Sequence, residues 1–186
     1  MKISGPKLKS NLYLFVLAIT LSSSSLSAQE DVFINEYLER LQKSKSYLIL
    51  IAEMMPEEQY SFRATPESMS FEEHLMHICW AMDWHSQSLM GERPARDWET
   101  DTALKVDDKT KQQMIATVEE TFDTTLFFIA NFDTTRLEER LDYFGADRTK
   151  RQILLLLADH VTHHRAQMLV YLRLNGLQPP RYVLFQ

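Results

Sequence analysis

Apolar residues recur at intervals of three and four along four long stretches of the chain, which is the pattern of helices with one buried face. In the first stretch, between Asp31 and Met55, they stand at Ile34, Tyr37, Leu38, Leu41, Leu48, Ile51 and Met55. A proline follows at position 56 and cannot continue a helix. We therefore predict a first helix that ends before Pro56.

A second helix is predicted to begin at Ser70, because Ser70 and Glu73 have the spacing of a capping box. Its apolar face comprises Phe71, Leu75, Ile78, Met82 and Leu89. Gly91 is the expected end of this helix. The preceding segment, 57–69, has no helical period, so we predict a connection that packs aromatic residues against the helices.

Two further helices are predicted in the second half of the chain. One covers about Asp108 to Asn131, after a polar and aperiodic loop at 91–106. The last runs from Thr149, which opens another capping box, to Gly176. Residues 131–147 are predicted to be irregular, since no alternating pattern long enough for a strand is present.

These four helices predict an all-α fold, a four-helix bundle in one domain. Each helix exposes an apolar stripe that only neighbouring helices can cover. We find neither an internal repeat nor a second domain. The two longer connections, after the second and third helices, leave the topology of the bundle open.

The first 28 residues have the composition of a secretory signal peptide. Three lysines precede an uncharged run from Asn11 to Leu21, and small residues follow up to Ala28. This run is shorter than the ~20 residues needed to cross a bilayer, so we predict cleavage and no stable membrane anchor afterwards. Cleavage a residue or two from Ala28 fits equally well. The mature domain, 29–186, is then exported to the periplasm or the extracellular space.

The whole chain of 186 residues contains 20 Lys and Arg against 26 Asp and Glu, which gives a formal net charge of −6. Removing the signal peptide takes away three lysines and no acid, so the mature charge becomes −9. This acidic balance argues against nucleic-acid binding through bulk positive charge. The single cysteine, Cys79, cannot form an internal disulfide and is predicted to be buried and inert.

All six histidines fall within the predicted second and fourth helices, at positions 74, 77, 85, 160, 163 and 164. His160 and His164 stand one turn apart in an apolar stripe, about 40° apart around the helix axis. Two neutral imidazoles at this spacing can bind one transition-metal ion, and the second helix could supply a third. Three protein ligands would leave a position open, as in catalytic sites.

The sequence resembles the DinB-like family, also called DinB/YfiT-like. The resemblance covers essentially the whole mature chain and rests on Ser70–Ile78, Asp159–Gln167 and Tyr171–Gly176, followed by Pro179 and Pro180. It implies a four-helix bundle that carries a divalent metal ion on three histidines, one from the second helix and two from the last. In this sequence those ligands are His77, His160 and His164. Zn²⁺ or Ni²⁺ is the expected ion, with Mn²⁺ or Fe²⁺ as alternatives.

The helical wheel and the resemblance disagree about the ligand from the second helix. His74 lies about 60° from the centre of the apolar stripe and His77 about 120°, so periodicity alone favours His74. We follow the family position, His77, and predict that His74 lines the pocket or supports a ligand. His85 is predicted to be a hydrogen-bonded core residue, and His163 to serve packing or hydrogen bonding.

Other residues near these histidines are candidates for the site. Asp83 and Asp159 are acidic, but periodicity alone places neither. Arg165 could orient the site or pair with an acid. Among the aromatic residues Trp80, Trp84, Phe62, Tyr60 and Tyr171, core positions are expected, with Trp84 the exception that we expect to line a pocket.

A metal ion on three histidines could activate water or a thiol. The resemblance implies either metal-dependent hydrolysis or thiol-dependent S-transfer or isomerisation of a small-molecule substrate. Predicted export favours hydrolysis, because low-molecular-weight thiols are chiefly cytosolic. A non-catalytic extracytoplasmic metal-binding module and a plain helical interaction domain stay as alternatives. The resemblance also implies that members form homodimers through faces of the bundle, which the surface pattern does not establish.

Overall fold

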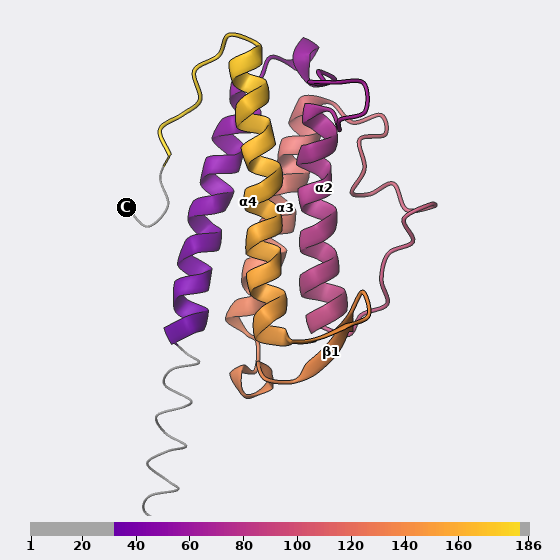
Figure 1. Ribbon diagram of the computed structural model, residues 1–186, viewed down its shortest axis with the longest axis vertical. Coiled ribbons are helices and arrows are strands. Elements are labelled where there is room, and N and C mark those ends of the chain that lie inside the picture. The colour runs from indigo at the N-terminus through magenta and orange to yellow at the C-terminus, as the bar shows by residue number, and fades with distance from the viewer. Residues whose placement is uncertain (1–31, 183–186) are drawn as a thin grey trace, which may run out of the picture.

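The computed structural model describes residues 32–182, and four long helices make up most of that range (Figure 1). The first is helical from residue 32 to residue 54. The others are α2 (Phe71–Asp83), α3 (Lys111–Ala130) and α4 (Lys150–Leu174), and η2 (Trp84–Met90) continues α2. The prediction of four helices is confirmed. The predicted signal peptide, residues 1–28, lies outside the described residues.

Each of α2, α3 and α4 begins at a capping box. Ser70 and Thr149 cap α2 and α4, as predicted, and Thr110 caps α3 in the same way. In each box the hydroxyl of the cap residue accepts a hydrogen bond from the backbone N–H of the residue three positions later. The side chain of that later residue accepts a hydrogen bond from the backbone N–H of the cap residue. The third helix begins later than predicted, because Asp108 has a φ of 54°, outside the helical region.

The first helix and α4 run in one direction (Figure 1). α2 and α3 both run in the opposite direction. This arrangement requires the connection at 91–110 to run back along the side of the bundle before α3 begins. α2 packs against both α3 and α4. The topology that the sequence left open is therefore not simple up-and-down.

A two-stranded antiparallel hairpin precedes α4 and was not predicted. β1 (Arg140–Tyr143) pairs with β2 (Ala146–Thr149), and Tyr143 lies opposite Ala146. The prediction of irregular structure at 131–147 is wrong here, because strands of four residues give too short an alternation to recognise. The turn residues Phe144 and Gly145 have φ of 52° and 79°, as a type I′ turn requires.

The end of the second helix is a π-helical segment, η2. Its wider turns shift the buried face by about one residue, so Met90 is fully buried while the predicted Leu89 is only partly buried. Gly91 follows, as predicted. A Cβ atom at position 91 would lie 2.7 Å from the carbonyl oxygen of Gln87 and 3.0 Å from Cε2 of Phe128. Close approach is thus one reason for glycine there.

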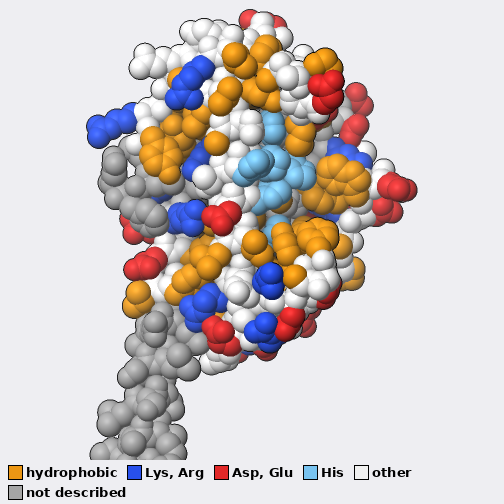
Figure 2. Space-filling model, in the orientation of Figure 1, with side chains coloured by type: hydrophobic (Ala, Val, Ile, Leu, Met, Phe, Trp, Pro, Cys, Tyr) orange, Lys and Arg blue, Asp and Glu red, His pale blue; other side chains and the backbone are white. Residues whose placement is uncertain are grey.

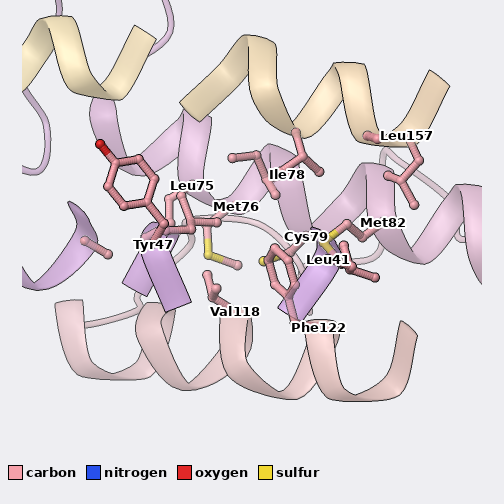
Figure 3. Packing of buried hydrophobic residues seen from close by; sticks show 14 of the residues in the cluster. Leu41, Tyr47, Leu75, Met76, Ile78, Cys79, Met82, Val118, Phe122 and Leu157 are labelled. Atoms are coloured by element: carbon pink, nitrogen blue, oxygen red, sulfur yellow. The ribbon is translucent and has the colours of Figure 1, made fainter. Parts of the chain in front are cut away.

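The apolar stripes of the four helices meet in one core (Figure 3). Its fully buried members include Leu48, Ile78, Cys79, Phe122 and Leu157. The predicted burial of Cys79 is confirmed, and burial raises the pKa of its thiol to about 12. Among the described residues no helix combines the length and apolarity needed to cross a membrane.

Candidate metal centre

Three histidine side chains converge between α2 and α4. α2 contributes His77, and α4 contributes His160 and His164, which lie on the same face one turn apart. One ring nitrogen of each lies within 4.8 Å of the other two. The ring centroids are 4.5 Å apart for His160 and His164 and 4.6 Å apart for His77 and His164. The structure thus brings together the three residues predicted as ligands.

The polar atoms of this cluster fit a divalent ion. Nδ1 of His77 and Nε2 of His160 are buried and have no hydrogen-bond partner. Buried polar atoms in native proteins nearly always have a partner, so two such nitrogens in one cluster require an explanation. Neutral imidazole is a common ligand of zinc, nickel and iron ions. An ion held by the three rings would satisfy both nitrogens.

His74 supports this cluster from α2. Its Nδ1 lies 2.9 Å from Nδ1 of His164, and both residues are buried. The hydrogen bond uses Nδ1 of His164, which leaves Nε2 as the nitrogen that can face an ion. This hydrogen bond fixes the orientation of the His164 ring, as a supporting residue would do.

Burial keeps the imidazoles of the cluster neutral. Burial, together with the neighbouring histidines, lowers the pKa of His164 to about 3 and those of His74 and His160 to about 4. Burial also lowers the pKa of His77. A metal ligand must be unprotonated, so the cluster is in its binding form at neutral pH without competition from protons.

The other two histidines lie beside the cluster in different environments. His85 is buried, donates from Nδ1 to the carbonyl oxygen of Ala81 at 2.7 Å, and lies 3.2 Å from the hydroxyl of Tyr143 through Nε2. Because burial lowers the pKa of His85, its Nε2 accepts and the Tyr143 hydroxyl donates. The predicted hydrogen-bonded core role of His85 agrees with these contacts. His163 is exposed, with its ring 5.0 Å from that of His164.

Two cavities open beside His77, and Trp98 lines both of them. The larger, about 560 Å³, is lined by His77 and His160 together with aromatic residues of α2, η2, the 91–110 connection and the hairpin. The smaller, about 330 Å³, is lined by His77, Glu73, Asp107 and several apolar side chains. Figure 2 shows the histidine side chains as one patch on the surface, beside hydrophobic groups. The cluster is thus accessible to small molecules.

A model of the DinB family matches residues 27–185. The chain belongs to the DinB family. No protein with a curated description matches it.

Two solved structures of DinB-like proteins share the fold of this DinB family member. One, from Bacillus subtilis, has a TM-score of 0.64 at 20% sequence identity and aligns over 81% of this chain and 99% of its own. The other, from Bacillus cereus ATCC 10987, has a TM-score of 0.64 at 18% identity over 79% of this chain and 95% of its own. At such identities the likeness shows the fold alone.

The two aspartates considered in the sequence lie away from the histidine cluster of this DinB protein. Asp83 forms ion pairs with Arg93 and Arg96, and it lines a separate polar cavity. Asp159 is exposed. Glu73 instead lines the smaller cavity beside His77, where its carboxylate accepts two hydrogen bonds from Arg63 at 2.5 and 2.7 Å. These bonds lower the pKa of Glu73.

Arg165 is buried between α4 and the first helix. It is only 2% exposed, and its guanidinium donates to the hydroxyl of Ser44 at 2.6 Å and lies over the ring of Tyr47 at 5.4 Å. It therefore links α4 to the first helix, and within residues 32–182 it forms no ion pair with an acid. Its neighbour His164 belongs to the histidine cluster, so this contact helps to fix the rotation of α4 that presents His164 to that cluster.

The aromatic residues of the DinB domain divide between core and cavity. Tyr60 and Tyr171 are buried and Phe62 is partly buried, as expected of core residues. Trp84 lines the larger cavity, as expected, and so does Trp80, which the sequence assigned to the core. Trp80 is only partly buried, and its ring lies 4.5 Å from the ring of Trp98 in the 91–110 connection.

Three residues of the cavity wall were not found from the sequence. Trp98 stands in the aperiodic connection, and Tyr143 and Phe144 stand in the unrecognised hairpin. Periodicity could not reveal them, because none lies on a helix. The Phe-Gly pair between two short alternating segments was the one local signal of the hairpin turn.

Proposed function

We propose that this DinB-family protein is a metal-dependent hydrolase in which His77, His160 and His164 hold a divalent ion, with Zn²⁺ or Ni²⁺ the leading candidates. The observation that supports it is the pair of buried, unpartnered nitrogens on His77 and His160 beside an accessible cavity. Structural zinc sites use four protein ligands, whereas this cluster offers three. The arrangement therefore favours catalysis over a purely structural site.

A bound divalent ion would supply Lewis acidity, polarising a carbonyl group and lowering the pKa of a water molecule. The residues of the chain would hold this ion and orient the imidazole rings that bind it. Neutral His77, His160 and His164 would provide the ligand nitrogens, and His74 would accept from Nδ1 of His164 and fix its ring. His77 and His160 line the larger cavity, so a carbonyl group of a small molecule there can reach the cluster.

The larger cavity also offers a polar group opposite the histidines. The hydroxyl of Tyr143 donates to His85, whose ring is fixed in turn by the carbonyl of Ala81. The oxygen of Tyr143 keeps its acceptor capacity, so it can bind an N–H or O–H group of a substrate. The smaller cavity holds the carboxylate of Glu73, which the ion pair with Arg63 keeps charged.

Metal analysis of the purified protein tests the first part of this proposal. We expect one equivalent of a divalent ion per chain, lost in His77→Ala and His160→Ala and retained in His163→Ala, a matched control on the exposed face of α4. Substoichiometric metal that His160→Ala does not reduce would overturn the metal site and favour a plain helical domain.

A substrate screen tests the second part. Metal-loaded protein is incubated with small esters, amides and lactones, and in parallel with electrophiles and a low-molecular-weight thiol. We expect turnover of a carbonyl substrate that disappears on chelation and in His160→Ala. Turnover with the thiol alone would replace hydrolysis by S-transfer, and full metal occupancy without turnover would favour a metal-binding module.

We also propose that the protein acts after export, on the basis of the signal-like composition of residues 1–28. Expression of the full chain in a Gram-negative host tests this. We expect the protein in the periplasmic fraction with an N-terminus within two residues of Gln29. Retention of residue 1 in a cytosolic product would contradict it.

A further inference from the structure

Five aromatic side chains from separate parts of the chain surround the larger cavity. Trp80 and Trp84 come from α2 and η2, Trp98 from the 91–110 connection, and Tyr143 and Phe144 from the hairpin. The ring of Trp84 lies 5.3 Å from that of Phe144, and the Trp80 and Trp98 rings are 4.5 Å apart and nearly perpendicular. The rings therefore hold one another in place while bounding a space of about 560 Å³.

Phe144 occupies a position that the fold alone would not favour. It is 82% exposed and has a φ of 52° at the first position of the type I′ turn. A bulky side chain at positive φ is strained, and Asn or Gly is the preferred residue there. Exposure means that little burial of the ring compensates for this strain. An aromatic ring held under strain at the rim of a cavity points to contact with a ligand.

The charges around the cavity select the kind of ligand. Among the described residues that line the cavity, Arg96 is the only one of the types Lys, Arg, Asp and Glu. Its guanidinium forms ion pairs with Asp83 at 3.2 Å and with Asp101 at 2.6 Å. A cation bound to His77 and His160 would repel a second cation, which argues against an ammonium ligand in this aromatic site. The walls otherwise offer ring faces and edges, which suit an uncharged aromatic group.

We propose that the larger cavity binds an uncharged aromatic group of the substrate, one or two rings in size, between Trp84, Trp98 and Phe144. The aromatic group then fixes the position of the substrate, whose polar end is directed toward His77 and His160. That the bound group belongs to a substrate rests on the proposed hydrolase function. Binding of the aromatic group itself requires neither a metal ion nor turnover.

Binding of a matched pair of probes tests the proposal. The probes are 2-naphthalenemethanol and its saturated analogue, decahydro-2-naphthalenemethanol, titrated calorimetrically into chelator-treated full chain and into zinc-loaded protein. We expect the aromatic probe to bind about tenfold more tightly than the saturated one in both forms, because ring contacts add to apolar burial. Equal affinities, or no binding of either probe, would overturn the proposal.

The variant Phe144→Asn separates a role in binding from a role in folding. Asn suits the positive φ of the turn, so the variant should unfold at a higher temperature than the parent while its affinity for the aromatic probe falls about tenfold. Phe127→Ala, which removes another exposed phenylalanine on α3, is the control and should leave affinity unchanged. Unchanged affinity in Phe144→Asn would count against the proposal, as would a lower unfolding temperature.

The outcomes distinguish this proposal from the hydrolase function. Metal loss in His160→Ala with equal binding of the two probes would support the metal site and reject the aromatic subsite. Selective binding of the aromatic probe, with no turnover of any ester, amide or lactone, would support the aromatic site and reject hydrolysis.

Discussion

The Nδ1 atoms of His74 and His164 share a buried hydrogen bond of 2.9 Å that joins α2 to α4. If Nε2 of His164 binds an ion, its Nδ1 carries the proton and donates it to His74. His74 then sets the tautomer and the orientation of a ligand without touching the ion, a relationship common around metal sites.

His74→Ala should therefore weaken metal binding without abolishing it. We expect the affinity for Zn²⁺ to fall about 10- to 100-fold, because the His164 ring loses its acceptor and its fixed orientation. His164→Ala should lose the metal entirely, and the exposed His163→Ala should match the parent protein. Competition with a chromogenic chelator measures all three variants. If His74→Ala bound no metal and His77→Ala kept full affinity, the roles of these two residues would be reversed.

The metal-free protein should become less stable as the pH falls below about 6.5. Burial lowers the pKa of His164 to about 3 and those of His74 and His160 to about 4 in the folded state, against about 6.5 in an unfolded chain. Between these values the unfolded chain binds more protons, so the free energy of unfolding decreases with falling pH. Above about pH 6.5, the pKa of histidine in the unfolded chain, this loss of stability is absent.

Thermal unfolding of chelator-treated protein between pH 7.5 and 5 checks this dependence. Glu73 stays charged across that window, because the bonds from Arg63 lower its pKa. We expect the unfolding temperature to fall steadily, and to fall less in a His74→Phe, His164→Phe double variant. An unfolding temperature that is constant over the whole window would show that these histidines are not kept neutral by the fold.

Removal of the Ser44 hydroxyl should destabilise the protein through Arg165. The guanidinium of Arg165 is buried and donates to Ser44, so Ser44→Ala leaves a charged donor without that acceptor. We expect a loss of about 1–3 kcal/mol in the free energy of unfolding. Ser46→Ala, on the exposed side of the same helix, should change it by under about 0.5 kcal/mol. Urea unfolding measures both, and equal values would refute the role of the buried contact.

Gly91→Ala should also destabilise the protein, because a methyl group there would lie 2.7 Å from the backbone oxygen of Gln87. Relief requires movement of η2, which carries Trp84 and His85, so we expect a loss of about 1–3 kcal/mol and altered tryptophan fluorescence. Gly145→Asn is the comparison without a clash, since nothing lies within 4 Å of the added Cβ, and its φ of 79° makes any loss there one of backbone strain alone. A fully stable Gly91→Ala protein would contradict the predicted clash.

The histidine from the second helix shows where periodicity stops being informative. The wheel favoured His74 because it lies nearer the centre of the apolar stripe. α2 packs against both α3 and α4, however, so its buried surface is wide and its centre does not point at α4. As a result both His74 and His77 reach α4, His74 through His164 and His77 through the pair His160 and His164.

The sequence by itself determined the features that depend on neighbours within one helix. The caps at Ser70 and Thr149, the apolar stripes and the one-turn spacing of His160 and His164 follow from helix geometry and local hydrogen bonding. Only the tertiary structure decided which side chains meet across elements. The 91–110 connection and the hairpin bring Trp98 and Phe144 to the cavity, and the packing of α4 on the first helix buries Arg165. Such contacts depend on the topology and rotation of whole elements, which no local spacing encodes.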